Sequence, residues 1–363
     1  MKKNFFCFKM PHGTYCGGVA SMINSYISKE EFFINNAFLP KIFDYKEPLI
    51  CKKVPSKISN ILYGFFQRRA ILKKLKKERN AQVHIHTSRQ FLFLKDVWLA
   101  KEIKRKRKAP VFITVHVGAA ETVFHRIGFA QKQTIRWINR YVDKVVFLGD
   151  NIRKEFEQLG MLSYKGTTLG NFHNLDKISV NEELPKNAKL NLLFVGAIHR
   201  DKGIIELLTA LSRISKLDVH LDICGQLTDS YIKQEFENLV NKLGNKVTLH
   251  GYVSGKEKTA LFERADVLIL PSYHEGFPLV ILEALASGCA IISTRVGATP
   301  EILDDENAFW VDVADAKQIE NGIIKMISDV IYLENMQQAN REKSKEFSIE
   351  EHIKTLCDIY KQV

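Results

Sequence analysis

Two glutamates eight residues apart form the first candidate site, because their side chains suit the binding of sugar hydroxyl groups. Glu275 lies in a segment that contains glycine and proline, whereas Glu283 lies in an apolar stretch typical of a helix. An ionised carboxylate accepts several hydrogen bonds, so each glutamate can hold a pair of hydroxyls. One of them can bind a ribose and the other a transferred sugar. The alternative, a surface glutamate beside an ordinary helix, fits the apolar neighbours of Glu283 less well.

The run 195–203 is a candidate site for a diphosphate. Gly196 follows a strand-like run, and a helix is expected over 204–211. Arg200 and Lys202 therefore lie at the mouth of a parallel sheet, which is where such folds bind their ligands. Two cations, together with the free N–H groups of a helix start, suit a diphosphate. The alternative is a polar loop that only connects a strand to a helix.

A pair of glycines, Gly17 and Gly18, precedes another helical stretch that starts near Ser21. Adjacent glycines let backbone N–H groups approach a phosphate at a helix N-terminus. A glycine pair between a strand and a helix often has only a steric role, so this signal is weak by itself.

Three histidines follow the expected strands of the first half. His84 and His86 close one strand-like run, and His116 closes the next one. Ligands of parallel sheets bind at the carboxyl ends of the strands. A lone histidine is more often structural, but histidines at two successive strand ends favour a functional role.

Short apolar runs alternate with longer helical stretches along most of the chain. The runs are rich in Val, Ile and Leu without strict alternation, as is typical of strands buried on both faces. They are 83–86, 111–115 and 145–148 in a first series and 192–195, 219–224, 247–249, 267–270 and 290–293 in a second. Alternating strands and helices predict parallel sheets with helices on both sides. Two series predict two doubly wound α/β domains.

The composition excludes several other classes of protein. The 363 residues are 45% hydrophobic and 26% charged, a balance typical of globular chains and not of disordered, collagen-like or coiled-coil ones. No apolar run reaches the roughly 18 residues that a spanning helix needs. The six cysteines include no C-x-x-C pair, so neither a zinc knuckle nor a dense disulfide framework is predicted.

Positive charge is concentrated in the first part of the chain, which points to an anionic partner. The net charge is +12, yet residues 1–150 carry 29 Lys and Arg against 10 Asp and Glu, a net +19. Residues 151–363 carry a net −7. Much of the excess lies in two basic clusters, 68–79 and 101–108.

These clusters leave two interpretations open. Helices carrying them can lie on an anionic membrane surface, with Phe65 and Phe66 dipping into it beside the cations. They can equally be solvated helix faces whose aromatic residues point to the core. Nucleic acid is disfavoured as a partner, because the sequence has no helix-turn-helix, RNP or zinc-finger pattern.

Taken together, these residues resemble the family 4 group of retaining glycosyltransferases with the GT-B fold. The resemblance rests on the E-x7-E pair, on the glycine pair, on the H-x-H and T-x-H strand ends, and on the runs 196–203 and 296–301. It covers nearly the whole chain, and its second half is the more specific. Two positions depart from the family pattern: Ala197 replaces the usual arginine, and Ala298 replaces a frequent glycine.

The resemblance implies roles for the candidate residues. Glu275 would bind hydroxyls of the transferred sugar, Glu283 would bind the ribose, and Arg200 with Lys202 would hold the diphosphate. A histidine would lie near the reacting centre, and the catalytic candidates are Glu275, His116, His86 and Lys202. The other implied donor-binding positions are Gly18, Gly196, Gly276, Phe277, Pro278 and Leu279.

The resemblance also implies two Rossmann-like domains that face a central cleft. An acceptor-binding domain is expected over 1–172, and a nucleotide-sugar-binding domain over 173–345. The polar stretch 174–189 is the expected linker. A terminal helix, expected within 346–363, would cross back to the first domain.

The implied reaction is retaining transfer of a hexosyl or N-acetylhexosaminyl group from a UDP- or GDP-sugar to a hydroxyl of a glycan. A lipid-linked acceptor in bacterial surface polysaccharide synthesis is expected, with the protein in the cytoplasm at the inner face of the membrane. The sequence has no D-x-D motif, so neither a metal nor another cofactor is expected.

Other functions remain open for comparison. A nucleotide-sugar-binding protein or an epimerase can share this fold. Two glutamates also suffice for glycoside hydrolysis, but a hydrolase would have no diphosphate for the run 195–203 to bind.

Overall fold

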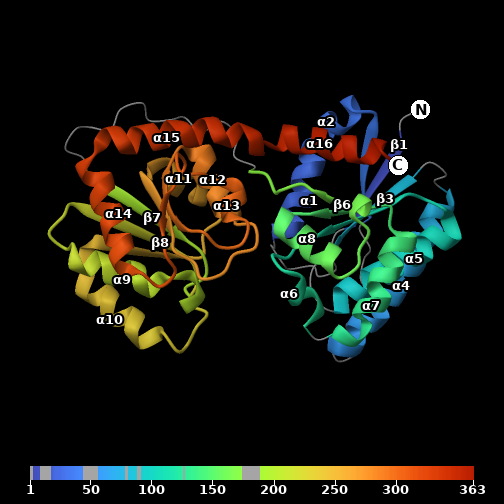
Figure 1. The fold of residues 1–363 in the computed structure, drawn as a ribbon, viewed down its shortest axis with the longest axis horizontal. Coiled ribbons are helices and arrows are strands. Elements are labelled where there is room, and N and C mark those ends of the chain that lie inside the picture. The colour runs from blue at the N-terminus through green and yellow to red at the C-terminus, as the bar shows by residue number, and fades with distance from the viewer. Residues whose placement is uncertain are drawn as a thin grey trace. The chain divides into compact units, whose positions relative to one another are not determined.

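The computed structural model describes residues 3–8, 18–43, 56–77, 81–87, 91–125, 127–173 and 189–363. The chain forms two compact units (Figure 1), the first comprising Met1–Gly170 and Ile349–Val363, the second Asn171–Ser348. Each unit has a parallel sheet and a hydrophobic core of its own. These two sheets confirm the expected α/β class. The assignment of an acceptor to the first unit and a donor to the second stays a prediction.

The first sheet has six strands in the order β2-β1-β3-β4-β5-β6, all parallel. The strands are β1 (Lys3–Phe8), β2 (Phe38–Phe43), β3 (Ala81–Thr87), β4 (Val111–Val115), β5 (Lys144–Phe147) and β6 (Gly166–Thr168). Every residue of β3 and β4 is buried, as expected for strands that helices cover on both faces.

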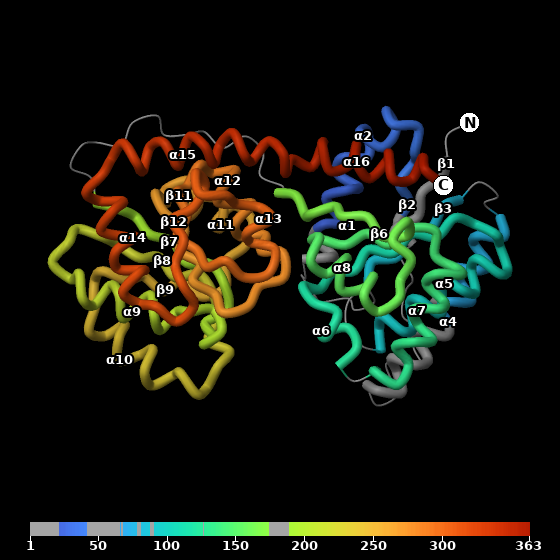
Figure 2. The backbone as a smooth tube through the Cα atoms, in the orientation of Figure 1, coloured from blue at the N-terminus to red at the C-terminus, as the bar shows by residue number. Residues whose placement is uncertain are grey.

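Helices cover both faces of the first sheet (Figure 2). They are α1 (Gly18–Ser28), α2 (Glu30–Asn35), α4 (Ser56–Lys77), α5 (Phe91–Arg107), α6 (Ala120–Phe124), α7 (Gln131–Tyr141), α8 (Asp150–Gln158) and α16 (Ile349–Lys361). Val83 and Ile85 of β3 share one core with α4, α5 and α7. His84 points to the opposite face, where it meets Tyr360 of α16.

The second sheet has the strand order β12-β11-β10-β7-β8-β9, again all parallel. The strands are β7 (Leu190–Val195), β8 (Val219–Cys224), β9 (Val247–Gly251), β10 (Val267–Leu270), β11 (Ala290–Thr294) and β12 (Phe309–Val311). The order reverses between β7 and β10, so the loops that follow these two strands part at a topological switch point. Ligands of open α/β sheets bind at this point.

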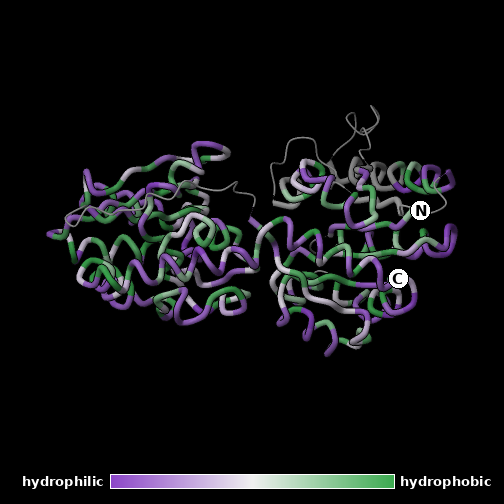
Figure 3. Tube along the Cα trace, turned by 90° about the horizontal axis from the view of Figure 1, so that it is seen from above, coloured by the Kyte–Doolittle hydropathy of each residue, from purple (hydrophilic) through white to green (hydrophobic). Residues whose placement is uncertain are grey.

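Two layers of helices enclose the second sheet, and Figure 3 shows hydrophobic segments running through the interior of each unit. The helices are α9 (Ile204–Arg213), α10 (Lys233–Leu243), α11 (Gly255–Arg264), α12 (Leu279–Ser287), α13 (Thr299–Ile302), α14 (Ala316–Ser328) and α15 (Val330–Ser344). Neighbouring residues of β7 face different layers: Leu192 packs with α9 and α14, and Leu193 with α11 and α12.

All eight expected strands are present, and the described part of the chain contains four further strands that the sequence patterns did not predict. Two of these, β6 and β12, have only three residues. β2 contains Pro40 and lies at the edge of its sheet, which is where proline is tolerated. β1 begins with polar residues. Within the described part of the chain, no helix is both long and apolar enough to span a membrane.

Two glycines allow the loops at the switch point to pack against one another. Gly203 follows the turn η3 (Arg200–Lys202) with φ +66°, and a Cβ there would lie 2.1 Å from the carbonyl oxygen of Pro271. Gly297 has φ +58°, and its Cβ would lie 2.0 Å from the carbonyl oxygen of Glu275. Both positions exclude a side chain by backbone conformation and by space.

One carboxyl group of the first unit is buried on α5. Asp96 is 8% exposed, and the burial raises its pKa to about 6. Between about pH 4 and pH 6 the folded protein therefore holds a proton that the unfolded chain has lost. The ionised form of Asp96 destabilises the fold, and its contribution to stability falls as the pH rises through that window.

Replacing Gly203 by alanine should destabilise the protein by about 3 kcal/mol or more, because the new Cβ adds a backbone clash to the strain of a left-handed conformation. Urea and thermal unfolding would measure the loss. Gly251→Ala is the matched control: it has the same φ of +66° and open space around its Cβ. It should cost only about 1–2 kcal/mol, and equal losses in the two variants would contradict the packing argument.

Asp96→Asn should stabilise the protein at pH 7 by roughly 2–3 kcal/mol, since it removes a carboxylate whose ionised form is disfavoured by burial. The gain should vanish near pH 4 and reach its full size above about pH 6. Unfolding measured across this range tests the expectation, with the exposed Asp218, changed to asparagine, as the control. A gain that does not depend on pH would show that ionisation of Asp96 is not its cause.

Candidate functional site

The run 195–203 and the loop that carries Glu275 meet at the switch point of the second sheet. Lys202 follows β7, and its Nζ donates a hydrogen bond to Oε1 of Glu275, which follows β10, over 2.7 Å. Ser272 Oγ donates to the same oxygen, also over 2.7 Å. The carboxylate is thus held by a cation and a hydroxyl in a part-buried position, where charge-assisted hydrogen bonds are strong.

Tyr273 ties this loop to the segment that follows β7. Its backbone N–H donates to the carbonyl of Asp201 over 2.8 Å, and its hydroxyl donates to Oε1 of Glu206 on α9 over 2.7 Å. Burial, together with the neighbouring Glu206, raises the pKa of Tyr273 to about 12. The hydroxyl therefore stays a donor at neutral pH and fixes the spacing between Lys202 and Glu275.

The end of β11 and the loop that follows it support the loop 271–278 from the other side. Thr294 Oγ1 donates to the carbonyl of Ser272 over 2.6 Å. The backbone N–H of Ala298 donates to the carbonyl of Gly276 over 2.9 Å. The loop 271–278 is therefore held by backbone contacts on both sides.

The remaining candidate donor-binding positions of this region lie along the same loop and the start of α12. Phe277 packs against the apolar cluster formed by α11 and α12. Pro278 caps α12, and Leu279 is its first residue, 37% exposed. Gly196 directly follows β7, and its backbone N–H donates a hydrogen bond to the carbonyl of Cys224.

Glu283 lies in α12 as expected, but it is paired with a lysine that sequence analysis did not single out. Lys258 Nζ of α11 donates to Oε1 of Glu283 over 2.6 Å. The other oxygen, Oε2, is buried and has no hydrogen-bond partner. Burial raises the pKa of Glu283, and Lys258 opposes that rise.

Arg200 and Lys202 point to different partners. The guanidinium of Arg200 is half exposed and donates to Oε2 of Glu235 on α10 over 3.0 Å. Its backbone N–H is 3.3 Å from Oδ2 of Asp229. Lys202 alone of the two contacts Glu275, and binding of a diphosphate by Arg200 and Lys202 stays a prediction.

The three histidines gather on one face of the first sheet. Nδ1 of His86 lies 2.9 Å from Nε2 of His116. His84 lies between the hydroxyls of Tyr360 and Thr114, 2.6 Å from each. Desolvation lowers the pKa of His84 to about 3 and of His116 to about 4, and holds the pKa of His86 well below its usual value. All three imidazoles are therefore neutral at pH 7, and Nε2 of His86 is buried without a partner.

A fourth histidine belongs to this cluster, and the sequence patterns did not predict it. His352 of α16 accepts or donates a hydrogen bond with the hydroxyl of Tyr26 over 2.6 Å and contacts the carbonyl of Gly170 over 2.9 Å. Sequence patterns could not reveal the place of His352, because a histidine on an amphipathic terminal helix has no motif around it.

Gly18 is the first residue of α1, whereas Gly17 lies outside the described residues.

The described parts of the basic clusters lie on α4 and α5. Several of their cations are neutralised: Arg68 and Lys106 pair with Glu102, and Lys104 pairs with Asp143. The side chain of Phe65 lies outside the described residues, and Phe66 is half-buried.

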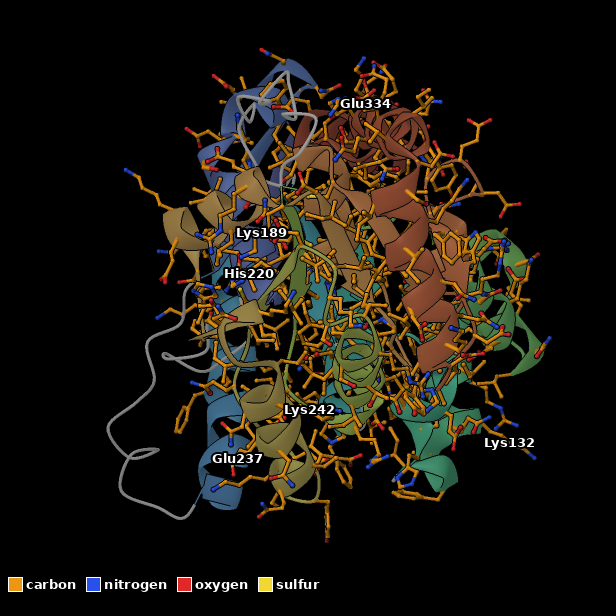
Figure 4. The ribbon with its side chains drawn as sticks, turned by 90° about the vertical axis from the view of Figure 1, so that its left-hand side faces the viewer. Lys132, Lys189, His220, Glu237, Lys242 and Glu334 are labelled. Carbon is orange, nitrogen blue, oxygen red and sulfur yellow. The ribbon has the colours of Figure 1, made fainter. Side chains whose placement is uncertain are left out.

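A further basic row lies on the neighbouring helix α7, and sequence analysis overlooked it. Lys132, Arg136 and Arg140 repeat every four residues and are all exposed, so they form one outer face. Figure 4 shows Lys132 extending outward from α7. Phe129, just before this helix, is 84% exposed.

Residues 176–343 match the family described as glycosyl transferases group 1. A 41.2 kDa protein in the cps region of Klebsiella pneumoniae is 27% identical over 96% of this chain and 97% of its own. A glycosyltransferase of Methanocaldococcus jannaschii is 31% identical, but that similarity spans only 47% of this chain and 44% of the relative.

Solved structures match the whole chain at low sequence identity. HepE of Anabaena, in complex with UDP, has a TM-score of 0.72 at 14% identity and covers 99% of this chain and 100% of its own. The lipopolysaccharide outer core galactosyltransferase WaaB has the same TM-score at 15% identity and the same coverage. These likenesses establish the fold. Residues 176–343 are therefore similar to the group 1 glycosyltransferases, and the whole chain has the GT-B fold.

Proposed function

We propose that the protein is a retaining glycosyltransferase of family 4 that moves a hexosyl or N-acetylhexosaminyl group from a UDP- or GDP-sugar to a hydroxyl of a glycan. The observation that carries this proposal is the contact between Lys202 and Glu275 at the switch point, 2.7 Å long. It brings a cation for the diphosphate next to an acceptor for sugar hydroxyls. The UDP bound to HepE supports a nucleotide sugar as the donor.

In the proposed reaction, the bond between the anomeric carbon and the diphosphate oxygen breaks while a bond to the acceptor oxygen forms, and the proton of the acceptor hydroxyl passes to the departing diphosphate. Negative charge grows on the departing diphosphate, and fixed positive groups aimed at that charge lower the barrier. Lys202 and the N–H groups at the start of α9 supply these groups. Glu275 would hold the transferred sugar and Glu283 the ribose. Because Lys202 and the start of α9 meet the charge of the diphosphate in this proposal, it includes no metal ion or other cofactor.

The neutral histidines of the first unit suit a role toward the acceptor. Because His86 and His116 are uncharged at neutral pH, either ring can accept a hydrogen bond from a hydroxyl group, while the lowered pKa makes both rings weak proton acceptors. The unpartnered Nε2 of His86 is the atom with spare hydrogen-bonding capacity. This supports catalytic roles for His86 and His116 alongside Glu275 and Lys202.

The acceptor we propose is a lipid-linked glycan of bacterial surface polysaccharide synthesis. The relative in the cps region and the lipopolysaccharide galactosyltransferase support this class of acceptor. The adjacent helices α4, α5 and α7 favour an anionic membrane surface as the place of action, because their outer faces carry exposed cations beside the exposed Phe129. The protein would then act in the cytoplasm at the inner face of the membrane.

A nucleotide-sugar-binding protein or an epimerase on the same fold is the competing function. A screen of UDP- and GDP-sugars distinguishes them. Each sugar is first tested for a rise in melting temperature, and the binding sugar is then incubated with glycan acceptors. A new glycosidic bond with retained anomeric configuration supports the proposal, whereas binding without transfer, or an epimerised donor, would refute it.

Within that assay, Lys202→Ala should lower kcat by about 100-fold or more while weakening donor binding much less, because the charge it meets grows in the transition state. Steady-state kinetics with the identified donor measure both quantities. Lys202→Arg should keep much of the rate, and the exposed Lys216, changed to alanine, serves as the control. Near-normal turnover of Lys202→Ala would remove its proposed role.

Reversing the charge of Lys132, Arg136 and Arg140 to glutamate should weaken binding to anionic vesicles by roughly 100-fold or more at low salt, since each surface cation contributes about 1 kcal/mol. Cosedimentation with phosphatidylglycerol-containing vesicles measures this, and binding should fall as salt rises. The control reverses the exposed Lys216, Lys242 and Lys256 of the second unit, which changes the net charge equally. Equal losses in both triple variants would contradict a membrane-binding face on the first unit.

A further inference from the structure

The ion pair between Lys258 and Glu283 lies at a glutamate to which the proposed function assigns ribose binding. The two side chains come from adjacent helices, α11 and α12, and their charged atoms are 2.6 Å apart. They are 27% and 19% exposed, so the pair is largely shielded from water. One oxygen of the carboxylate is bound to the lysine, and the other, Oε2, has no donor.

This arrangement leaves one oxygen of the Glu283 carboxylate without a hydrogen-bond donor. A buried oxygen without a hydrogen-bond donor costs free energy, and an ionised carboxylate has room for several further hydrogen bonds. Two vicinal hydroxyl groups of a ribose would supply the missing donors. The pair therefore has spare acceptor capacity of the kind that the proposed nucleotide site needs.

Lys258 is the cation that stabilises the charge of Glu283. Among the elements packed against α12, β11 carries no titratable side chain, and Arg341 of α15 lies beside Gly288 at the far end of the helix. Burial favours the protonated form of Glu283, and the ammonium group of Lys258 opposes this. Without the lysine, the carboxyl group would take up a proton at a higher pH.

We propose that Lys258 is a positioning residue of the nucleotide site, which holds Glu283 ionised and oriented so that its carboxylate accepts hydrogen bonds from the ribose hydroxyls. This inference rests on the ribose role that the proposed function gives to Glu283. Lys258 itself acts through the glutamate and makes no contact with the nucleotide. Selection for ribose over deoxyribose follows, because only the ribose offers both hydroxyl groups to the charged carboxylate.

The expected sign of the pH dependence separates this role from a merely structural one. In a Lys258→Met variant, protonation of Glu283 would remove its acceptor capacity as the pH falls. As the pH is lowered, the affinity of the variant for a nucleotide should therefore fall at a higher pH than that of the unaltered protein, because burial raises the pKa of Glu283 and Lys258 no longer opposes the rise. Loss of packing alone would weaken binding equally at every pH.

The test titrates UDP, GDP and inorganic pyrophosphate calorimetrically into the full-length protein at pH 6, 7 and 8. Lys258→Met should weaken binding of the preferred nucleotide about 10-fold or more at pH 6, with a smaller loss at pH 8. Lys258→Arg should restore most of the affinity. The exposed Lys256 on the same helix, changed to methionine, should behave as the unaltered protein, and pyrophosphate should bind all variants equally.

A Glu283→Gln variant makes the possible failures distinguishable. If Glu283→Gln weakens nucleotide binding while Lys258→Met does not, the role of Lys258 is overturned and the ribose role stands. If Glu283→Gln leaves the affinity for the nucleotide unchanged, the ribose role of Glu283 is refuted. The inference about Lys258 is then refuted as well, because it depends on that role. Equal weakening of pyrophosphate binding by Lys258→Met, or a loss that does not depend on pH, also overturns the inference.

Discussion

The arrangement of the second unit depends on the close packing of two loops that leave adjacent parallel strands at the same sheet edge. The loop after β7 and the loop after β10 diverge at the switch point. Because Gly203 has no side chain, their backbones still approach more closely than a Cβ atom at this position would permit. Because of that approach, Tyr273 reaches both Asp201 and Glu206. The contact of Lys202 with Glu275 follows from these anchors, so the backbone fixes the geometry before any ligand is present.

In the first unit, burial keeps a cluster of histidines uncharged. Its histidines lie between the fully buried strands β3 and β4 and the terminal helix, where water cannot stabilise a positive charge. The rings therefore stay neutral and are linked to one another and to tyrosine hydroxyls. Cations are thus exposed on the outer helices of this unit while its histidine cluster is uncharged, and the second unit keeps paired charges at its sheet edge.

Much of this architecture could be predicted from the sequence, because buried parallel strands leave long runs of Val, Ile and Leu. The runs around β4, β8 and β10 have the same bounds in the structure, and the Glu275 and Glu283 pair was found through its spacing. Edge strands such as β2 and three-residue strands such as β12 were missed, because they bury too little apolar surface to leave a pattern. Lys258, Glu206 and His352 were missed for another reason: each matters through a partner distant in the sequence, and nothing in its own neighbourhood marks it.

The path of the chain has a consequence for how the protein is made. Tyr360 and His352 belong to the first unit, yet their partners His84 and Tyr26 lie 276 and 326 residues earlier. All of Asn171–Ser348 is synthesised between the first sheet and the helix that completes its polar cluster. At about 5–20 residues per second, the ribosome needs roughly 10–40 seconds for that stretch. During translation the second unit can therefore fold first, and the unit that begins the chain is the last to be finished.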